Sequence, residues 1–444
     1  MELNTGSIKD LERILQARAI EKYGEEISFE ECEAFWHSDD VVQWFQAKGY
    51  TLYKLSTGSE YDPGTTSPSL PFDLFSEFNY PYAYHNAQME GGGEPSLRAH
   101  DSTRRIVYAQ DSQGRHVVIK LTHVATEECR ILRFLHKQGV EVLRQNCILP
   151  ILDEIQYQNA CFFVTPRWGT NADQPECHTL RDILDMMRSM LKAVTFLHSH
   201  NIIHRDISLY NMLVNHFGDE LEPRAYWPMR HPQLKAGKLC YVLMDFDLSI
   251  MMPGEVKKQD LRLPWHKAMV GTMGPNDIMQ GEYDYNPFAY DVGTVGVVFT
   301  QSYQHHAKDI PLLAPLFDML VTKDINRRFT ADEALRFLDE EVIAKSTEEQ
   351  LSISERPGYL DEELASYEEY DRWKDLPAEF QQEWAAYREP LGVPWTARIL
   401  RMLVLSEFIP AHTVPNIRWF LVSLVSLPRD IVSFLITHAS QNNM

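Results

Sequence analysis

Apolar residues recur at helical spacing near the start of the chain. Residues 7–23 place isoleucine and leucine three or four positions apart, which predicts an amphipathic helix that ends at Gly24. Ser28 and Glu31 have the spacing of a capping box, in which the two side chains satisfy free backbone N–H groups. A second helix is therefore expected from Ser28 to Gly49.

Turn-forming runs separate this start from the rest of the chain. The segments "STGSEYDPGTTSPSLP" (56–71) and "GGGEP" (91–95) predict loops because glycine and proline break regular structure. After them come β-branched runs at 104–111 and 115–122, which the turn "SQG" joins into a predicted hairpin. Two further strands are expected at residues 147–155 and 160–168.

Helical patterns dominate the second half. Residues 179–200 are amphipathic, and residues 286–303 are apolar on every side, which predicts a buried helix. Residues 348–389 hold 13 acidic residues against four basic ones and predict solvated helices, with an acidic docking surface as the alternative. The apolar stretch from Ile417 is cut by "PRD" at 428–430, so we expect buried helices and no membrane span.

Strands precede helices along the chain, which is typical of the α+β class rather than of a doubly wound sheet. We expect four parts. They are a partly helical N-terminal extension (1–95), a β-rich part (96–168), a helical part (169–345), and a C-terminal extension that is acidic and then apolar (346–444).

The net charge of the 444-residue chain is −21. That charge argues against broad binding of nucleic acid or anionic membranes, although it leaves a local basic groove for a phosphate ligand open. None of the six cysteines forms a CxxC pair, which favours free thiols in a reducing compartment. The N-terminus lacks the apolar core of a secretory signal, so an intracellular protein, cytoplasmic or nuclear, is expected.

The candidate chemistry begins at Lys120, which ends the strand-like run "HVVIK". A lysine on a strand beneath bound phosphates can neutralise their charge, although most lysines are solvated surface residues. A predicted helix follows and begins at "EE", so it can present Glu128 to this lysine, with Glu127 as the competing partner. The simpler interpretation of both carboxylates is a favourable interaction with the helix dipole.

The run "HRDISLYN" and the later "MDFD" supply the other polar groups. Asp206 on a rigid loop can accept the proton of an incoming hydroxyl. Asn211, five residues later, can offer its amide oxygen to a magnesium ion. Asp245 follows an apolar strand, where its carboxylate can bind the same metal.

These motifs resemble those of the eukaryotic protein kinase superfamily over about residues 98–340, and more narrowly the divergent kinase-like proteins of fungi. The resemblance implies a bilobal α+β fold, with a small β-rich N-lobe and a larger helical C-lobe. It also implies ATP and Mg²⁺ as cofactors, with Lys120 on the α and β phosphates, Glu128 as its ion-pair partner, and Asp206 as catalytic base. Asn211 and Asp245 are then the metal ligands.

Further positions match the same family. Val118 and Leu213 would form the roof and floor of the adenine site, and the stretch from Thr165 to Trp168 would be the hinge between lobes. Asp291 in "DVGTVG" would anchor the backbone of the catalytic loop. Arg328 in "DINRRFT" would be the structural arginine near the end of the domain.

The chain also departs from the family pattern. Glycines should cover the nucleotide, but residues 94–113 contain none, and the three glycines of 91–93 lie far upstream. Ser208 replaces a lysine that stabilises the transferred phosphoryl. Asp247 replaces a glycine that permits a backbone flip between active and inactive states. Aspartate tolerates positive φ better than most residues, but it would stiffen this switch and place a second carboxylate near the metal.

Two further segments differ. An insertion at 216–237 is polar and rich in proline, which predicts a surface loop or hairpin. "GTMGPND" lacks the family glutamate, so Asp277 is the nearest acid for Arg328. Thr272 and Ser249 are candidate phosphosites, because the HRD arginine Arg205 suggests recognition of a phosphorylated segment.

Three functions fit these residues. The first is an atypical ATP-dependent kinase that transfers the γ-phosphate to a Ser/Thr hydroxyl of a protein substrate. The second is a pseudokinase that acts as a scaffold or interaction module, which the missing glycines favour. The third is a small-molecule kinase, a group that carries an acid at the position of Asp247 but lacks the arginine of HRD.

Overall fold

The computed structural model describes most of the chain, and the described residues are 3–19, 29–56, 64–76, 79–87, 96–101, 105–169, 179–222, 227–255, 257–268, 270–354, 366–406, 409–410 and 412–425. The chain divides into two compact units. The first comprises Met1–His204, Ser208–Met252 and Leu338–Tyr359, and the second comprises Arg205–Ile207, Pro253–Phe337 and Leu360–Met444. The four predicted parts do not coincide with these units, and their boundaries stay a prediction.

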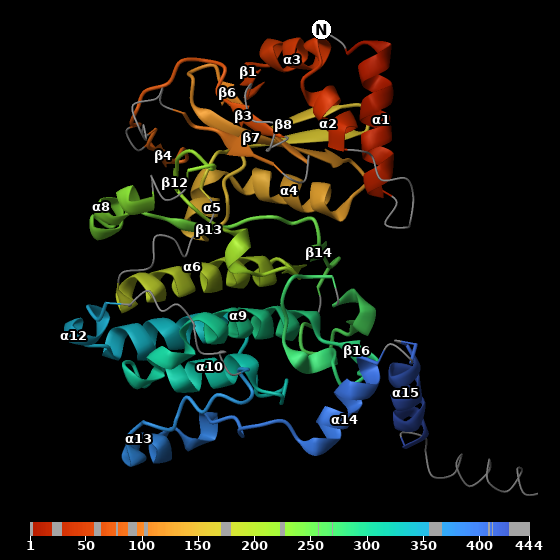
Figure 1. Cartoon of the computed structure of the whole chain (residues 1–444). Helices are drawn as coiled ribbons and strands as arrows, with labels where there is room; N and C mark the ends of the chain where they lie inside the picture. The colour runs from red at the N-terminus through yellow and green to blue at the C-terminus, as the bar shows by residue number, and fades with distance from the viewer. Residues whose placement is uncertain are drawn as a thin grey trace, which may run out of the picture. The chain divides into compact units, whose positions relative to one another are not determined.

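A five-stranded antiparallel sheet organises the first unit (Figure 1). In sheet order its strands are β1 (Tyr50–Leu52), β6 (Ile106–Asp111), β7 (His116–His123), β9 (Ala160–Pro166) and β8 (Asp153–Tyr157). The predicted hairpin is confirmed as β6–β7, whose turn contains Gly114 at a φ of 75°. The strand expected at 147–155 is shorter than predicted, because only β8 lies in the ladder.

One face of this sheet is covered by the N-terminal segment. Side chains alternate along a strand, so Val117, Ile119 and Leu121 of β7 point to the same side. They share a core with α1 (Thr5–Ala19), α2 (Phe29–Trp36) and α3 (Asp39–Ala47), which lie against the sheet in Figure 1. The N-terminal segment also supplies β1, which pairs with β6.

The single helix expected from Ser28 to Gly49 is wrong, because the chain forms α2 and α3 instead. Ser38 is in the extended conformation between them, and its hydroxyl donates to the Phe35 carbonyl at 3.0 Å. Two aspartates follow Ser38 in the first turn of α3, so this stretch is itself a helix start. Gly24 and Ser28 lie outside the described residues.

The insertion at 216–237 is not a surface loop. Its first residues form β12 (His216–Phe217), which pairs with β4 (Tyr84–His85), and α8 (Arg230–Lys235) follows. Phe217 and the Arg230 side chain are buried. The predicted loop at 56–71 likewise contains a strand, β3 (Thr65–Ser67), between β2 (Lys54–Leu55) and β5 (Ala99–His100). The "GGG" of 91–93 lies outside the described residues.

Helices and short ladders complete the first unit. The amphipathic helix predicted at 179–200 is confirmed as α6. The remaining elements of this unit are α4 (Glu127–Gln138), α5 (Val140–Gln145), α6 (Leu180–Ser199), β10 (Ile202–Ile203), η1 (Leu209–Asn211), β11 (Met212–Val214), η2 (Trp227–Met229), β13 (Tyr241–Leu243), β14 (Ile250–Met251), η6 (Leu338–Ile343) and α12 (Glu348–Leu351).

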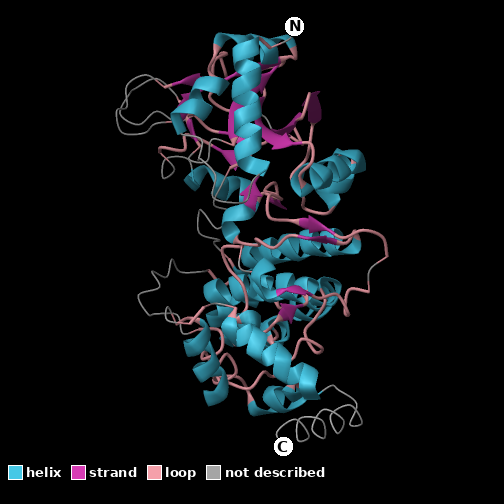
Figure 2. Ribbon diagram, turned by 90° about the vertical axis from the view of Figure 1, so that its right-hand side faces the viewer, coloured by secondary structure: helices cyan, strands magenta, loops and turns pink. Residues whose placement is uncertain are grey.

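The second unit is mostly helical (Figure 2). The predicted buried helix at 286–303 is confirmed as α9, whose side chains are buried around most of its circumference. The elements are β15 (Leu263–Pro264), η3 (Trp265–Lys267), η4 (Asn276–Ile278), β16 (Asp284–Tyr285), α9 (Pro287–Tyr303), η5 (Gln304–Lys308), α10 (Leu313–Val321), α11 (Ala331–Phe337), α13 (Ala378–Glu383), η7 (Ala385–Tyr387), α14 (Trp395–Val404) and α15 (Thr413–Val425).

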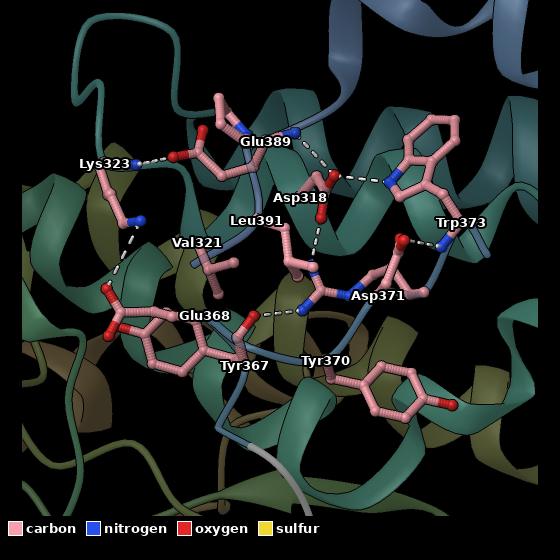
Figure 3. A pocket seen from close by; sticks show the side chains of 12 residues that line it. Asp318, Val321, Lys323, Tyr367, Glu368, Tyr370, Asp371, Trp373, Glu389 and Leu391 are labelled. Carbon is pink, nitrogen blue, oxygen red and sulfur yellow. Dashed lines mark hydrogen bonds and ion pairs between the residues drawn. The ribbon is translucent and has the colours of Figure 1, made fainter. Parts of the chain in front are cut away.

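The acidic stretch after residue 365 is not simply a solvated face. The side chains of Trp373 and Glu368, which belong to this stretch, are buried. Asp318 of α10 accepts from the Trp373 indole at 2.7 Å and from the Glu389 backbone at 2.8 Å (Figure 3). The segment therefore folds onto α10.

The late apolar stretch also differs from its prediction. Ile417, Trp419 and Phe420 of α15 are more than half exposed, whereas buried helices were expected from Ile417 onward. Among the described residues, no helix combines the length and apolar character that a membrane crossing needs.

Candidate active site

A cavity of about 870 Å³ lies in the first unit, on the sheet face opposite to the N-terminal helices. Val118 and Lys120 of β7 alternate with the core residues of that strand and therefore line the cavity. Thr165 of β9 and Leu213 of β11 contribute further wall. The predicted roof, floor and hinge residues are thus brought together around one space.

Lys120 is held between two carboxylates at the wall of this cavity. Its Nζ lies 2.5 Å from Glu128 Oε1 and 2.6 Å from Asp245 Oδ1. Burial by itself lowers the pKa of Lys120, but the two carboxylates outweigh that effect and raise it. The lysine is therefore a fixed cation at any physiological pH.

Glu128 reaches Lys120 because α4 begins one residue before it. Thr126 caps the helix by accepting from the Cys129 backbone at 3.2 Å, which fixes the first turn. Glu127 points elsewhere and pairs with Arg130 at 2.7 Å. Of the two candidates left open by the sequence, Glu128 is the partner.

Asp245 has a backbone conformation that few residues other than glycine adopt, with φ at 64°. Burial raises the pKa of its carboxyl, but Lys120 and more distant cations lower it further, so the net shift is downward. Asn211 lies near this aspartate, since the Met244 backbone donates to the Asn211 carbonyl at 3.0 Å. Strained backbone at a charged cavity wall is typical of functional sites.

Asp247, the residue after the DF pair, is held by an ion pair rather than by a special backbone conformation. Among the described residues of this run, positive φ occurs at Asp245 and not at Asp247. The Asp247 carboxylate instead pairs with Arg105 Nη1 at 2.6 Å. Arg105 and Asp101 line the cavity in the part of the chain where the family has glycines. Charged side chains therefore occupy the region where backbone amides were expected.

Asp206 belongs to the second unit, and its surroundings there are well defined. Its Oδ1 accepts from the Thr272 backbone at 2.6 Å. The neighbouring Arg205 backbone donates to Asp291 at 2.9 Å, as predicted for the residue that anchors this loop. A side chain at Gly271 would collide with the Arg205 carbonyl, so only glycine fits there.

Asp277 takes the place of the missing glutamate. Arg328 donates to both of its carboxylate oxygens, at 2.6 and 2.8 Å, and the arginine side chain is fully buried. A bidentate pair of this kind fixes both position and orientation. The ion pair that the sequence left open is therefore present.

Two serines near the site are buried. Ser208 is 1% exposed, and its hydroxyl has no hydrogen-bond partner among the described residues. Ser249 is 2% exposed and donates to the His204 carbonyl at 3.0 Å, and its candidacy as a phosphosite stays a prediction. Thr272 is exposed, and its role as a phosphosite also stays a prediction.

Sequence reasoning missed a buried polar cluster beside the cavity. Arg167, within the predicted hinge stretch, is fully buried, and Glu220 of the insertion binds it at 3.0 Å. The Arg167 guanidinium also donates to the Tyr53 hydroxyl at 3.1 Å. Glu220 lines the cavity. Nothing in the local pattern signals this cluster, because Arg167 lies 53 residues from Glu220 and 114 residues from Tyr53.

Comparison with known proteins places these motifs in a family. A family model described as protein tyrosine and serine/threonine kinase matches residues 104–266. This segment belongs to the protein kinase superfamily. The expected kinase-type α+β fold is thereby confirmed. The matched kinase segment contains Lys120, Glu128, Asp206, Asn211 and Asp245.

Two curated relatives are viral kinases. The chain is 33% identical over 114 residues to the serine/threonine-protein kinase US3 homolog of varicella-zoster virus (strain Dumas), which is 23% of this chain and 26% of that protein. It is 32% identical over 77 residues to the corresponding homolog of Cercopithecine herpesvirus 9 (strain DHV), 16% of this chain and 22% of that protein. The chain thus spans about a quarter of the length of these relatives. The likeness to fungal proteins stays a prediction.

Proposed function

We propose that this chain is an ATP-dependent protein kinase that transfers the γ-phosphate of ATP to a serine or threonine hydroxyl of a protein. The observation that supports it best is Lys120, held by Glu128 and Asp245 at the wall of the cavity. An unused surface lysine would not sit between two carboxylates, one of them on strained backbone.

The cavity fits a nucleotide. Its volume is within the range of small-molecule sites, and its walls are mainly apolar around a few polar groups. Val118, Thr165 and Leu213 would contact the base, and Lys120 would neutralise phosphate charge. Asn211 and Asp245 offer oxygen atoms, the ligands that Mg²⁺ prefers.

Magnesium would not need a dedicated protein cage. Among the described residues, no three His, Cys, Asp or Glu side chains gather as metal ligands. Mg²⁺ is usually held by one or two protein groups together with phosphates and water, which agrees with one amide and one carboxylate. When bound, Mg²⁺–ATP supplies the phosphoryl group and neutralises part of its charge.

In this proposal Asp206 accepts the proton of the substrate hydroxyl. The Thr272 amide at 2.6 Å fixes one oxygen of its carboxylate and so limits the orientation of the group. A positioned base of this kind contributes about 10²- to 10⁴-fold to the rate. Buried Ser208 offers no cation, so the rate is expected to be lower than that of kinases with lysine there.

A pseudokinase is the second candidate, because residues 94–113 contain no glycine and Ser208 replaces the lysine. Thermal melting with Mg²⁺–ATP and transfer of labelled phosphate to protein acceptors test both candidates. The kinase hypothesis predicts a rise in melting temperature and a loss of about 100-fold or more in transfer for Asp206→Asn. The exposed Asp260→Asn is the matched control.

The outcomes separate the candidates. A rise in melting temperature without phosphate transfer favours the pseudokinase. Equal phosphate transfer by wild type and Asp206→Asn would mean that Asp206 is not the catalytic base. Transfer to small alcohols but not to proteins favours a small-molecule kinase. No melting shift at millimolar nucleotide contradicts ATP binding, and with it both kinase hypotheses.

A further inference from the structure

The segment beside Asp206 is held by a part of the chain outside the kinase match. Thr272 donates to Asp206, and Gly271 packs against the Arg205 carbonyl. Gly271 and Thr272, the first two residues of the stretch 271–283, therefore lie directly beside Asp206 within the second unit. We call residues 271–283 the acceptor segment. A shift of the acceptor segment would move the Thr272 amide that orients the Asp206 carboxylate.

Two residues of the C-terminal extension hold the middle of the acceptor segment. The Asn276 backbone donates to the Tyr367 hydroxyl at 2.8 Å, and its side-chain amide donates to Glu368 Oε2 at 2.7 Å. Arg328 holds the next residue, Asp277. Asn276 is thus fixed at both backbone and side chain by neighbouring residues of one distant segment.

Glu368 is itself rigidly supported. Its side chain is 3% exposed, and Arg401 of α14 binds its two oxygens at 2.6 and 2.8 Å. Burial raises the pKa of Glu368, but the bonds to Arg401 and the nearby Lys323 outweigh that effect and lower it. Figure 3 shows Tyr367 and Glu368 beside Lys323, on the stretch that Asp318 anchors to α10. A buried and paired carboxylate of this kind holds its partner amide in one place.

Helix α15 holds the end of the acceptor segment. Arg418 binds Glu282 at 2.9 Å and also donates to the Gln280 carbonyl. Gly281 has a φ of 76°, and a side chain there would meet Val414. The acceptor segment therefore has three supports from the extension: Tyr367 with Glu368, the helix α14 behind them, and α15.

We propose that the C-terminal extension is a positioning element for the phosphoacceptor, acting through the contacts of Tyr367 and Glu368 with Asn276. This inference rests on the proposed kinase function. The nucleotide cavity lies in the first unit, whereas these contacts all lie in the second. Weakening them should therefore change the use of the protein substrate and leave nucleotide binding alone.

Tyr367→Phe tests the proposal in the full chain, because it removes one hydroxyl and keeps the ring. We expect the KM for a protein or peptide acceptor to rise about three- to tenfold, since one hydrogen bond is lost, with the KM for ATP within about twofold. The control is Tyr387→Phe in the same extension, whose hydroxyl has no hydrogen bond within the described part of the chain.

Arg401→Lys tests the same support through Glu368, which Arg401 holds in place. Lysine keeps the charge but loses the two-pronged bond to Glu368, so the acceptor KM should rise in the same direction. Arg398→Lys on the same helix is the matched control, because Arg398 is 63% exposed and lies 3.7 Å from its partner Glu369. Equal acceptor KM values for Arg401→Lys and Arg398→Lys would overturn the proposal.

Hydrogen exchange gives a readout that needs no activity. Amides of 271–283 should exchange faster in Tyr367→Phe than in Tyr387→Phe. If wild type transfers no phosphate, the proposed function fails, and exchange alone then decides whether the extension holds the acceptor segment. Unchanged exchange together with unchanged acceptor KM overturns the positioning role.

Discussion

Buried ionisable side chains in this protein are stable only because of their immediate partners. Arg167 is fully buried within the predicted hinge stretch, and its two terminal nitrogens donate to Glu220, Tyr53 and three backbone carbonyls. His116 lies in the same cluster, with Nδ1 2.5 Å from the Tyr53 hydroxyl. Charge and burial thus work against each other here, which makes the cluster sensitive to pH.

His116 gives a prediction about pH. Burial, followed by the nearby Arg167 and His85, lowers the pKa of His116 to about 2. The unfolded chain takes up a proton below about pH 6.5 that the folded protein does not, so the free energy of unfolding falls as the pH drops. When the pH is lowered from 6.5 to 5, the free energy of unfolding should fall in both proteins. The fall should be smaller in His116→Gln than in wild type, by roughly 1–2 kcal/mol.

Urea unfolding at the two pH values measures this effect. The exposed His266→Gln serves as control and should follow wild type. A His116→Gln variant with the full pH dependence of wild type would show that this imidazole is not held neutral in the folded protein.

At the scale of elements, the start of α4 decides which glutamate reaches Lys120. The helix begins at Glu127, and the cap at Thr126 fixes its first turn, so that Glu128 faces the lysine. The sequence predicted a helix with two candidate partners, because a shift by one residue turns a helix by about 100°. Only the position of the cap separates them.

Thr126→Ala should destabilise the first unit by about 1 kcal/mol, because the Cys129 amide loses its acceptor. Thr126→Ser keeps the hydroxyl and should stay within a few tenths of a kcal/mol of wild type. Chemical denaturation measures both. Equal stability of the alanine and serine variants would mean that the cap contributes nothing measurable.

For the molecule as a whole, the N-terminal segment is part of the kinase sheet rather than an appendage. It supplies β1 at one edge and covers one face with α1, α2 and α3. Trp44 of α3 is 2% exposed and packs against Phe45 and Phe162, with ring centroids 4.9 and 5.6 Å away. The hydrophobic core of the first unit depends on these contacts.

Trp44→Ala should therefore destabilise the protein by about 3–5 kcal/mol through loss of buried area and a residual cavity. Trp395→Ala is the control, because Trp395 is 73% exposed and its loss should cost less than about 0.5 kcal/mol. Melting temperature and soluble yield report both changes. If Trp44→Ala and Trp395→Ala had the same melting temperature, the N-terminal helices would not stabilise the sheet.

Local patterns alone predicted much of the kinase segment. The β6–β7 hairpin, α6 and α9 follow from side-chain period and turn residues. Motif spacing also singled out Lys120, Asp206, Asn211 and Asp245 as candidate site residues, and their roles stay a prediction. Such features depend on neighbours within a few positions, which a sequence displays directly.

Tertiary structure decided everything that joins distant segments. Nothing local predicts that Glu220 satisfies Arg167, that Arg105 pairs with Asp247, or that Tyr367 and Glu368 hold Asn276. The insertion and the acidic extension look like solvated surface from composition, yet both bury charged groups. The physical reason is that a buried charge needs a partner, and only folding over long separations in sequence brings that partner within reach.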